Sequence, residues 1–267
     1  MNDTRDAASA APVVIAVLLV ANDEERLGRV LESIRWATVR FVVDLGSTDA
    51  SLRVAESAGA VCVDRELIGP RLAELTAAWV LLLEGHEVVP PELGDEIQRL
   101  TRTMAGDGAA VAPHGAFIVE RDVCFLGRRL RTRAGTDRAG IRLLRPEQVS
   151  WPRALVSLDG VEATGAVGRL RGRLQAQPYA SLHHYIDRMD VLTTARAQAQ
   201  PTAGPAVGWA AMAVRPAWRV ARALPMAVVL DRVAGAVLAL LEGYRELVAA
   251  AKIWEREGAG APAAGPR

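Results

Sequence analysis

Short apolar runs of strand length alternate with helix-spaced apolar positions over the first part of the chain. Four such runs cover residues 13–20, 40–44, 60–63 and 79–83. Between them, apolar side chains recur three and four residues apart, as they do on one face of a helix. Strands that alternate with helices predict an α/β fold, in which a mostly parallel, Rossmann-like sheet is flanked by helices and joined by right-handed crossovers.

The pattern changes after this region. Adjacent prolines at Pro90 and Pro91 predict the start of another helix, because proline is favoured in the first helical turn. Short strand-like pieces then follow at residues 109–112, 116–120 and 141–144. They predict a mixed or antiparallel extension of the sheet.

The chain divides into segments of different composition. We expect an α/β domain over residues 13–197, a linker rich in Pro and Gly over 198–208, and C-terminal amphipathic helices over 209–257. The two ends, residues 1–12 and 258–267, are expected to be disordered.

The C-terminal segment is apolar but interrupted by charges. A long apolar helix is expected from Met226 to about Trp254, and Asp231, Arg232 and Glu242 within it make it a poor membrane span. Two interpretations stay open for this segment. It is either an interfacial helix pair that makes peripheral contact with a membrane, or an amphipathic segment that packs on the domain or on a second subunit.

Charge and cysteine content narrow the function classes. Lys and Arg number 32 and Asp and Glu number 31, which gives a formal net charge of +1. A globally basic nucleic-acid-binding protein is thereby excluded, and no nucleic-acid partner is expected. Cys62 and Cys124 are too few for a disulfide framework and lack the spacing of a zinc site. The first apolar run is shorter than the roughly 20 residues of a spanning helix, and no secretory signal is visible, so the expected location is cytoplasmic.

Three polar clusters follow the predicted strands, at residues 22–25, 44–49 and 84–87. Ligands of parallel sheets bind beyond the carboxyl ends of the strands, where these clusters converge. The Asp44 carboxylate there could accept hydrogen bonds from a ribose or a base, although its spacing alone favours a helix cap. Glu84 and His86 could share a divalent cation with a diphosphate, or form only a solvated turn.

Several segments carry a family resemblance. The run LLVANDEERLGRVLESIRWA from Leu18, followed by FVVDLGSTDAS from Phe41, resembles the start of family 2 glycosyltransferases, which have the GT-A nucleotide-diphospho-sugar fold. The segments FLGRRLR…IRLLR from Phe125, YASLHHYIDRMD from Tyr179 and LLEGYRELVAAAKIWE from Leu240 are similar to the branch that resembles bacterial lipopolysaccharide-core glucosyltransferases.

The resemblance implies transfer of a sugar from a nucleotide-sugar donor to a cell-envelope glycan or a lipid-linked acceptor. In that family a divalent cation, Mg or Mn, stabilises the leaving diphosphate and a carboxylate deprotonates the acceptor. Carried over by position, the resemblance implies donor-binding residues Asn22, Glu24, Asp44, Ser47 and Asp49, metal-binding residues Glu84, His86 and Glu87, and Asp137 or Asp159 as the base.

The chain departs from the family at its chemical positions. The metal motif reads Glu84-Gly85-His86 in place of Asp-x-Asp, and Arg138 stands where an aspartate is expected, one residue from Asp137. A Val-His-Glu segment appears as Ser157-Leu158-Asp159, a Lys-Asn segment is missing before Trp79, and an expected histidine falls near Ala176. Three hypotheses therefore stand: an active glycosyltransferase with altered metal use, a catalytically impaired relative that acts as a scaffold in envelope glycan assembly, and an interaction protein in which the C-terminal helices matter most.

Overall fold

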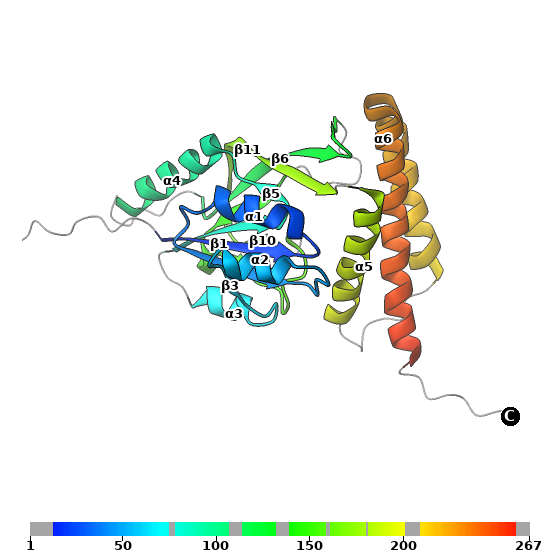
Figure 1. Ribbon diagram of the computed structural model, residues 1–267, viewed down its shortest axis with the longest axis horizontal. Helices are drawn as coiled ribbons and strands as arrows, with labels where there is room; N and C mark the ends of the chain where they lie inside the picture. Colours follow the sequence, from blue (N-terminus) through cyan, green and yellow to red (C-terminus); the bar gives the residue numbers. More distant parts are fainter. Residues whose placement is uncertain are drawn as a thin grey trace, which may run out of the picture. The chain divides into compact units, whose positions relative to one another are not determined.

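The computed structural model describes residues 13–74, 78–106, 114–131, 139–158, 161–179, 181–200 and 209–259. The chain forms two compact units. The first comprises residues 1–122 and 139–176, and the second comprises residues 123–138 and 177–267. The expected α/β architecture with a C-terminal helical extension is confirmed (Figure 1).

Four parallel strands form the first half of the sheet in the order β3-β2-β1-β4. Their bounds are β1 Val13–Val20, β2 Val39–Asp44, β3 Val61–Cys62 and β4 Ala78–Glu84. Val20 of β1 lies opposite Asp44 of β2, and Leu19 lies opposite Glu84 of β4. The carboxyl ends of these three strands therefore meet at one edge. From β1 the chain continues to β2 and β3 on one side of β1, and it then crosses to β4 on the other side. The gap between β1 and β4 is therefore the topological switch point of the sheet.

Four helices belong to the same unit: α1 Glu24–Ser33, α2 Ser51–Ser57, α3 Ile68–Ala73 and α4 Pro91–Gly106. The predicted apolar face of α1 is fully buried, and it shares one core with alternate residues of β1 and with Leu93 and Ile97 of α4. Since both faces of β1 are buried after Val13, the prediction of a doubly covered strand is confirmed.

The rest of the sheet confirms the predicted mixed extension. It contains β5 Glu87–Val88, β6 Ala116–Phe125, β7 Arg128–Arg129, β8 Ala139–Leu144 and β11 Val167–Tyr179. Strand β8 pairs antiparallel with both β4 and β6, and β11 pairs antiparallel with β5. A small separate hairpin joins β9 Val149–Ser150 to β10 Glu162–Ala163. The strand expected at residues 109–112 lies outside the described residues, and β11 was not predicted.

The second unit contains α5 Leu182–Ala199 and α6 Trp209–Ala259. The prediction of one continuous helix from Met226 to Trp254 is wrong, because the backbone breaks at Arg232, where φ is 52° and ψ is −130°. We call residues 209–231 the first arm, residues 233–259 the second arm, and the two together the helical hairpin (Figure 1, yellow and orange to red).

Contacts between the arms establish that they run side by side. Ala227 and Ala239 form a small core, and Arg219 Nη1 lies 2.6 Å from Glu246 Oε1. The second arm also packs on α5, where Lys252 Nζ donates to Asp190 Oδ1 at 2.7 Å. The unit is therefore built on three helical segments. The linker and end segments expected from the sequence fall largely on residues that the structure does not describe, and those boundaries stay predictions.

Candidate functional site

The loop after β1 is tied to the loop after β2. Asn22 adopts a left-handed conformation, with φ of 52°, which asparagine tolerates better than most residues. Its backbone N–H donates to Ser47 Oγ at 3.0 Å, and its side-chain Oδ1 accepts from the Thr48 N–H at 2.8 Å. These bonds span 25 and 26 residues of sequence, so they fix the two loops against each other at the carboxyl edge of the sheet.

The Asp44 carboxylate closes its own turn. It accepts from the Ser47 N–H at 3.1 Å, from the Ser47 hydroxyl at 2.6 Å and from the Gly46 N–H at 3.2 Å. Gly46 has a φ of +106°, a conformation that favours glycine. Helix α2 starts later, at Ser51, so the interpretation of Asp44 as a helix cap is wrong.

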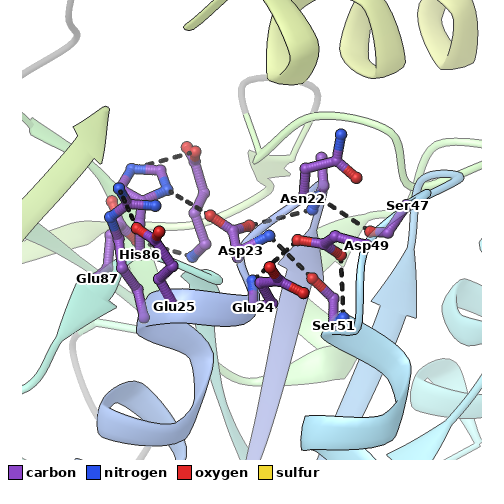
Figure 2. A network of polar contacts seen from close by, with 12 residues as sticks. Asn22, Asp23, Glu24, Glu25, Ser47, Asp49, Ser51, His86 and Glu87 are labelled. Carbon is purple, nitrogen blue, oxygen red and sulfur yellow. Dashed lines mark hydrogen bonds and ion pairs between the residues drawn. The ribbon is translucent and has the colours of Figure 1, made fainter. Parts of the chain in front are cut away.

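A reciprocal pair links the starts of α1 and α2. Asp49 Oδ2 accepts from the Glu24 N–H at 3.1 Å, and Glu24 Oε2 accepts from the Ala50 N–H at 2.7 Å. Asp49 Oδ1 also accepts from the Ser51 N–H at 2.9 Å. The structure thus brings all five predicted donor-binding residues together on two linked loops. Figure 2 shows Asn22, Glu24, Ser47 and Asp49 among them. Their contact with a nucleotide stays a prediction.

Glu87 is held in a buried ionic cluster. Its carboxylate is fully buried, and Oε1 accepts from Arg121 Nη1 at 3.0 Å and from Arg142 Nη2 at 3.1 Å. Its other oxygen, Oε2, accepts from the Glu84 N–H at 2.9 Å. Both oxygens of Glu87 are therefore engaged by the protein itself.

Sequence reasoning missed Arg121 and Arg142. One signal was present for Arg121, because β6 alternates buried and partly exposed residues and Arg121 occupies a buried position between Val119 and Val123. A positively charged side chain at a buried position of a strand needs a buried partner of opposite charge. Here the partner is Glu87, which is 34 residues away in the sequence.

Asp23, Glu84 and His86 meet between β1 and β4, at the switch point. His86 is almost fully buried, with Nε2 3.6 Å from Glu84 Oε2 and Nδ1 3.9 Å from Asp23 Oδ1 (Figure 2). Asp23 is also buried, and its Oδ2 accepts from the Ala21 N–H at 3.0 Å. Glu84 is the most open member, with 29% of its side chain exposed.

The donor set at this position does not fit a divalent cation. Hard cations need several oxygen ligands, but the Glu87 carboxylate is bound by two guanidinium groups. Arg121 Nη1 also lies 3.5 Å from Glu84 Oε1. In the part of the chain that the structure describes, no three His, Cys, Asp or Glu side chains are grouped to hold a metal ion. The metal-binding roles expected for Glu84, His86 and Glu87 therefore have no complete ligand set among these residues.

The remaining candidate residues, Asp137, Asp159 and Cys62, add little to the description of the site. Asp137 and Asp159, the predicted bases, both lie outside the described residues. Cys62 is an exposed free thiol at the end of β3. Burial of the sulfur raises the pKa of Cys62, and the nearby Glu56 and Asp44 carboxylates raise this pKa further. The thiol is thus protonated at neutral pH, which makes it a poor nucleophile.

Gly85 allows the ends of β1 and β4 to approach closely. A Cβ at this position would lie 2.5 Å from Asp23 Oδ2 and 2.9 Å from Asp23 Cγ. The buried Asp23 carboxylate would have to move for any larger residue to fit.

Gly85→Ala is therefore expected to lower the free energy of unfolding by about 1–3 kcal/mol, the usual cost of overpacking. Gly28 in α1 is the matched control, because its Cβ would meet only Val54 Cγ1 at 3.8 Å. Gly28→Ala should leave stability unchanged or raise it by up to about 1 kcal/mol through helix propensity. Urea unfolding of the full chain measures both. Equal stability of the two variants would show that Asp23 moves aside at no cost.

Comparison with known proteins gives distant likenesses. No protein-family model matches the chain. Among solved structures, S. aureus TarS 1-349 has a TM-score of 0.41 and 10% identity, over 92% of this chain and 90% of that chain. Glucosyl-3-phosphoglycerate synthase from Mycobacterium tuberculosis, solved with Mn2+, uridine diphosphate and glucosyl-3-phosphoglycerate, has a TM-score of 0.41 and 16% identity, over 72% of this chain and 81% of that chain. At these scores, the likenesses carry no conclusion about what this chain does.

Proposed function

We propose that this chain is a GT-A glycosyltransferase-like protein that binds a nucleotide-sugar donor at the carboxyl edge of β1, β2 and β4. The observation that carries the proposal is the convergence of three polar loops at the switch point between β1 and β4. Open α/β sheets bind their ligands at this point. The ligand class comes from the resemblance of residues 13–60 to family 2 glycosyltransferases.

The linked loops after β1 and β2 suit a nucleoside. Asp44 is only partly buried, and a carboxylate offers about four acceptor positions. Three donors of its own turn make four hydrogen bonds to it, because the Ser47 N–H lies 3.1 Å from both oxygens. The partly exposed carboxylate can share an oxygen with a ribose hydroxyl or a base N–H, and the bonds within the turn hold the carboxylate in place before the ligand arrives. Little side-chain entropy is then lost on binding.

The switch point would meet the diphosphate. Of the three carboxylates there, Glu84 and Glu87 are paired with Arg121 and Arg142, and Asp23 accepts from the Ala21 N–H. An incoming diphosphate therefore meets carboxylates that are partly neutralised by guanidinium groups, and guanidinium is a good partner for phosphate oxygens. The described residues at this point offer no complete ligand set for a metal ion.

The acceptor half of the reaction rests on the resemblance. We propose a cell-envelope glycan or lipid-linked acceptor, with Asp137 or Asp159 as the base that removes the proton of the acceptor hydroxyl. The oxygen so activated would attack the anomeric carbon, and the nucleoside diphosphate would leave with the bonding electrons. A catalytically impaired protein would retain donor binding but lack this step.

Donor binding is tested by calorimetric titration of the full chain with UDP, GDP and ADP. We expect one of them to bind, and Asp44→Asn to weaken this binding at least about tenfold, or about 1.4 kcal/mol. Asp187→Asn is the matched control, because Asp187 lies on α5, where it pairs with His183. Absence of binding by all three nucleotides would overturn the proposal.

Turnover separates the active enzyme from the impaired one. Release of nucleoside diphosphate from the matching nucleotide-sugar, in the presence of envelope extract, should fall at least about a hundredfold in the variant that lacks the base. The variants to compare are Asp137→Asn and Asp159→Asn. Binding without any turnover would support the impaired protein.

A further inference from the structure

The second arm of the helical hairpin has an inverted distribution of polarity. From Val233 to Trp254, every side chain that is more than one-third exposed is aliphatic or aromatic. These side chains are Val233, Leu240, Tyr244, Leu247 and Trp254, with exposures from 40% to 76%. In a protein surrounded by water, this surface would normally be polar.

Most charged residues of the same arm are wholly or partly buried, and Glu255, close to the end of the arm, is exposed. Glu242 is only 2% exposed and pairs with Arg245, whose Nη2 lies 2.7 Å from Glu242 Oε2. Glu246 pairs with Arg219 of the first arm, and Lys252 pairs with Asp190 of α5. Polar contacts thus hold this arm to its neighbours, and its apolar side chains are left outside.

The first arm is apolar on several sides near the break. Val228, Val229 and Leu230 are 47%, 75% and 43% exposed. Consecutive helical residues point about 100° apart, so these three cover roughly 200° of the helix circumference. A single partner helix covers a narrower stripe than this. A medium that surrounds the helix, such as the lipid phase, accommodates it better.

Exposed charge on the first arm has a single sign. Arg215, Arg219 and Arg222 are its exposed charged residues, and Trp218 between them is 68% exposed. Arginine and tryptophan side by side suit the headgroup level of a bilayer, where the ring and the guanidinium each find a favourable environment. The charge of Arg215 and Arg222 is complementary to anionic lipid, while Arg219 is paired with Glu246.

We propose that the helical hairpin is an interfacial anchor that lies on an anionic bilayer, with its exposed apolar side chains at the boundary of headgroups and acyl chains. Within the segment from Met212 to Arg256, the most apolar 18-residue window has a mean hydropathy of 1.9, and 22% of that window is buried inside the protein. It does not cross the bilayer. The charged pair Asp231 and Arg232 occupies the break, and charges at the bilayer centre are costly.

The anchor is tested by flotation of the full chain with vesicles of phosphatidylcholine and phosphatidylglycerol at low salt. We expect the chain to float, and the double variant Leu240→Glu and Leu247→Glu to lower the partition coefficient at least tenfold. Val61→Glu is the matched control, because Val61 is 47% exposed on β3 in the other unit and should not change flotation. Binding should also weaken on vesicles of phosphatidylcholine alone, and in high salt through charge screening.

A second measurement protects the test against misfolded variants. Brominated lipids should quench tryptophan fluorescence of the unaltered chain, and the quenching should fall in Trp218→Phe and Trp254→Phe, which keep the fold. Failure of the unaltered chain to float on anionic vesicles at low salt would overturn the anchor. A dimer that forms without vesicles and is broken by Leu240→Glu, with no flotation, would equally overturn it and assign the face to a second copy. Neither result bears on donor binding.

Discussion

Arg142→Met is expected to lower the free energy of unfolding by about 3–5 kcal/mol, because it removes one partner of a buried charge. Arg142 is 3% exposed and Glu87 is fully buried, and the two are joined at 3.1 Å. Arg121 alone would remain on Glu87 Oε1, in a place that water does not reach. Methionine fills much of the volume of the lost side chain, so the effect reports the charge rather than a cavity.

Arg169→Met is the matched control for this effect. Arg169 pairs with Glu120, but its side chain is 58% exposed, so the pair is screened by solvent. The expected loss is below about 1 kcal/mol. Urea unfolding measures both variants, and Glu87→Gln with Arg142→Met completes a double-mutant cycle. The double variant should lose less than the sum of the single variants, since neither charge is then left unpaired. Similar losses for Arg142 and Arg169 would contradict a special role for the buried cluster.

The sequence pattern predicts the strands that are apolar throughout better than those that alternate. Strands β1 and β4 stand out because both faces are covered, which leaves no polar residue inside them before Glu84. Strand β11 was missed, although Leu170 and Leu174 are buried on one of its faces. Arg171 and Arg173 lie between these two leucines, and Arg169 directly precedes them, so the arginines hide the strand. Such a strand carries a weak local signal because only one of its faces is apolar.

The break in α6 had no signal in the apolar pattern. Asp231 and Arg232 read as two charges within a long apolar helix, and Arg232 is not a residue that favours a positive φ. The reversal is fixed by contacts distant in sequence. Gly243 lies against Val220 of the other arm, where a Cβ would come within 2.3 Å of Val220 Cγ2. Close packing of this kind depends on the tertiary structure and cannot be seen from spacing.

The sequence predicts the position of the site better than it predicts the chemical role of each residue in it. The carboxyl ends of parallel strands share an edge, so the convergence of Asn22, Asp44 and Glu84 follows from the strand order. The strand order does not reveal which partners each carboxylate has. Glu87 looked available to a cation, but it binds Arg121 and Arg142, which are 34 and 55 residues away. These partners come from β6 and β8, whose pairing was not predictable from the motif itself.

His86→Asp is expected to make the stability of the chain depend on manganese. His86 lies between Asp23 and Glu84, at 3.9 Å and 3.6 Å. An aspartate there adds a third carboxylate to a largely buried place, and like charges repel. Without metal we expect a loss of about 2–3 kcal/mol, which for a chain of this size is a fall in Tm of roughly 5–10 °C.

Manganese should restore much of the stability that His86→Asp loses. A cation at about one hundred times its Kd stabilises the folded state by about 2.7 kcal/mol, since it binds the folded protein alone. The Tm of the unaltered chain should not move with manganese, because the charge of its carboxylates is already balanced by Arg121 and Arg142. His86→Ala is the matched control, because it opens the same space without adding a ligand. The Tm of this variant should not change when manganese is added. Calorimetric scans with manganese and with a chelator measure all three proteins. A rise of several degrees in the unaltered chain would mean that Glu84 and His86 hold a cation as they stand, and that the arginine pair does not exclude it.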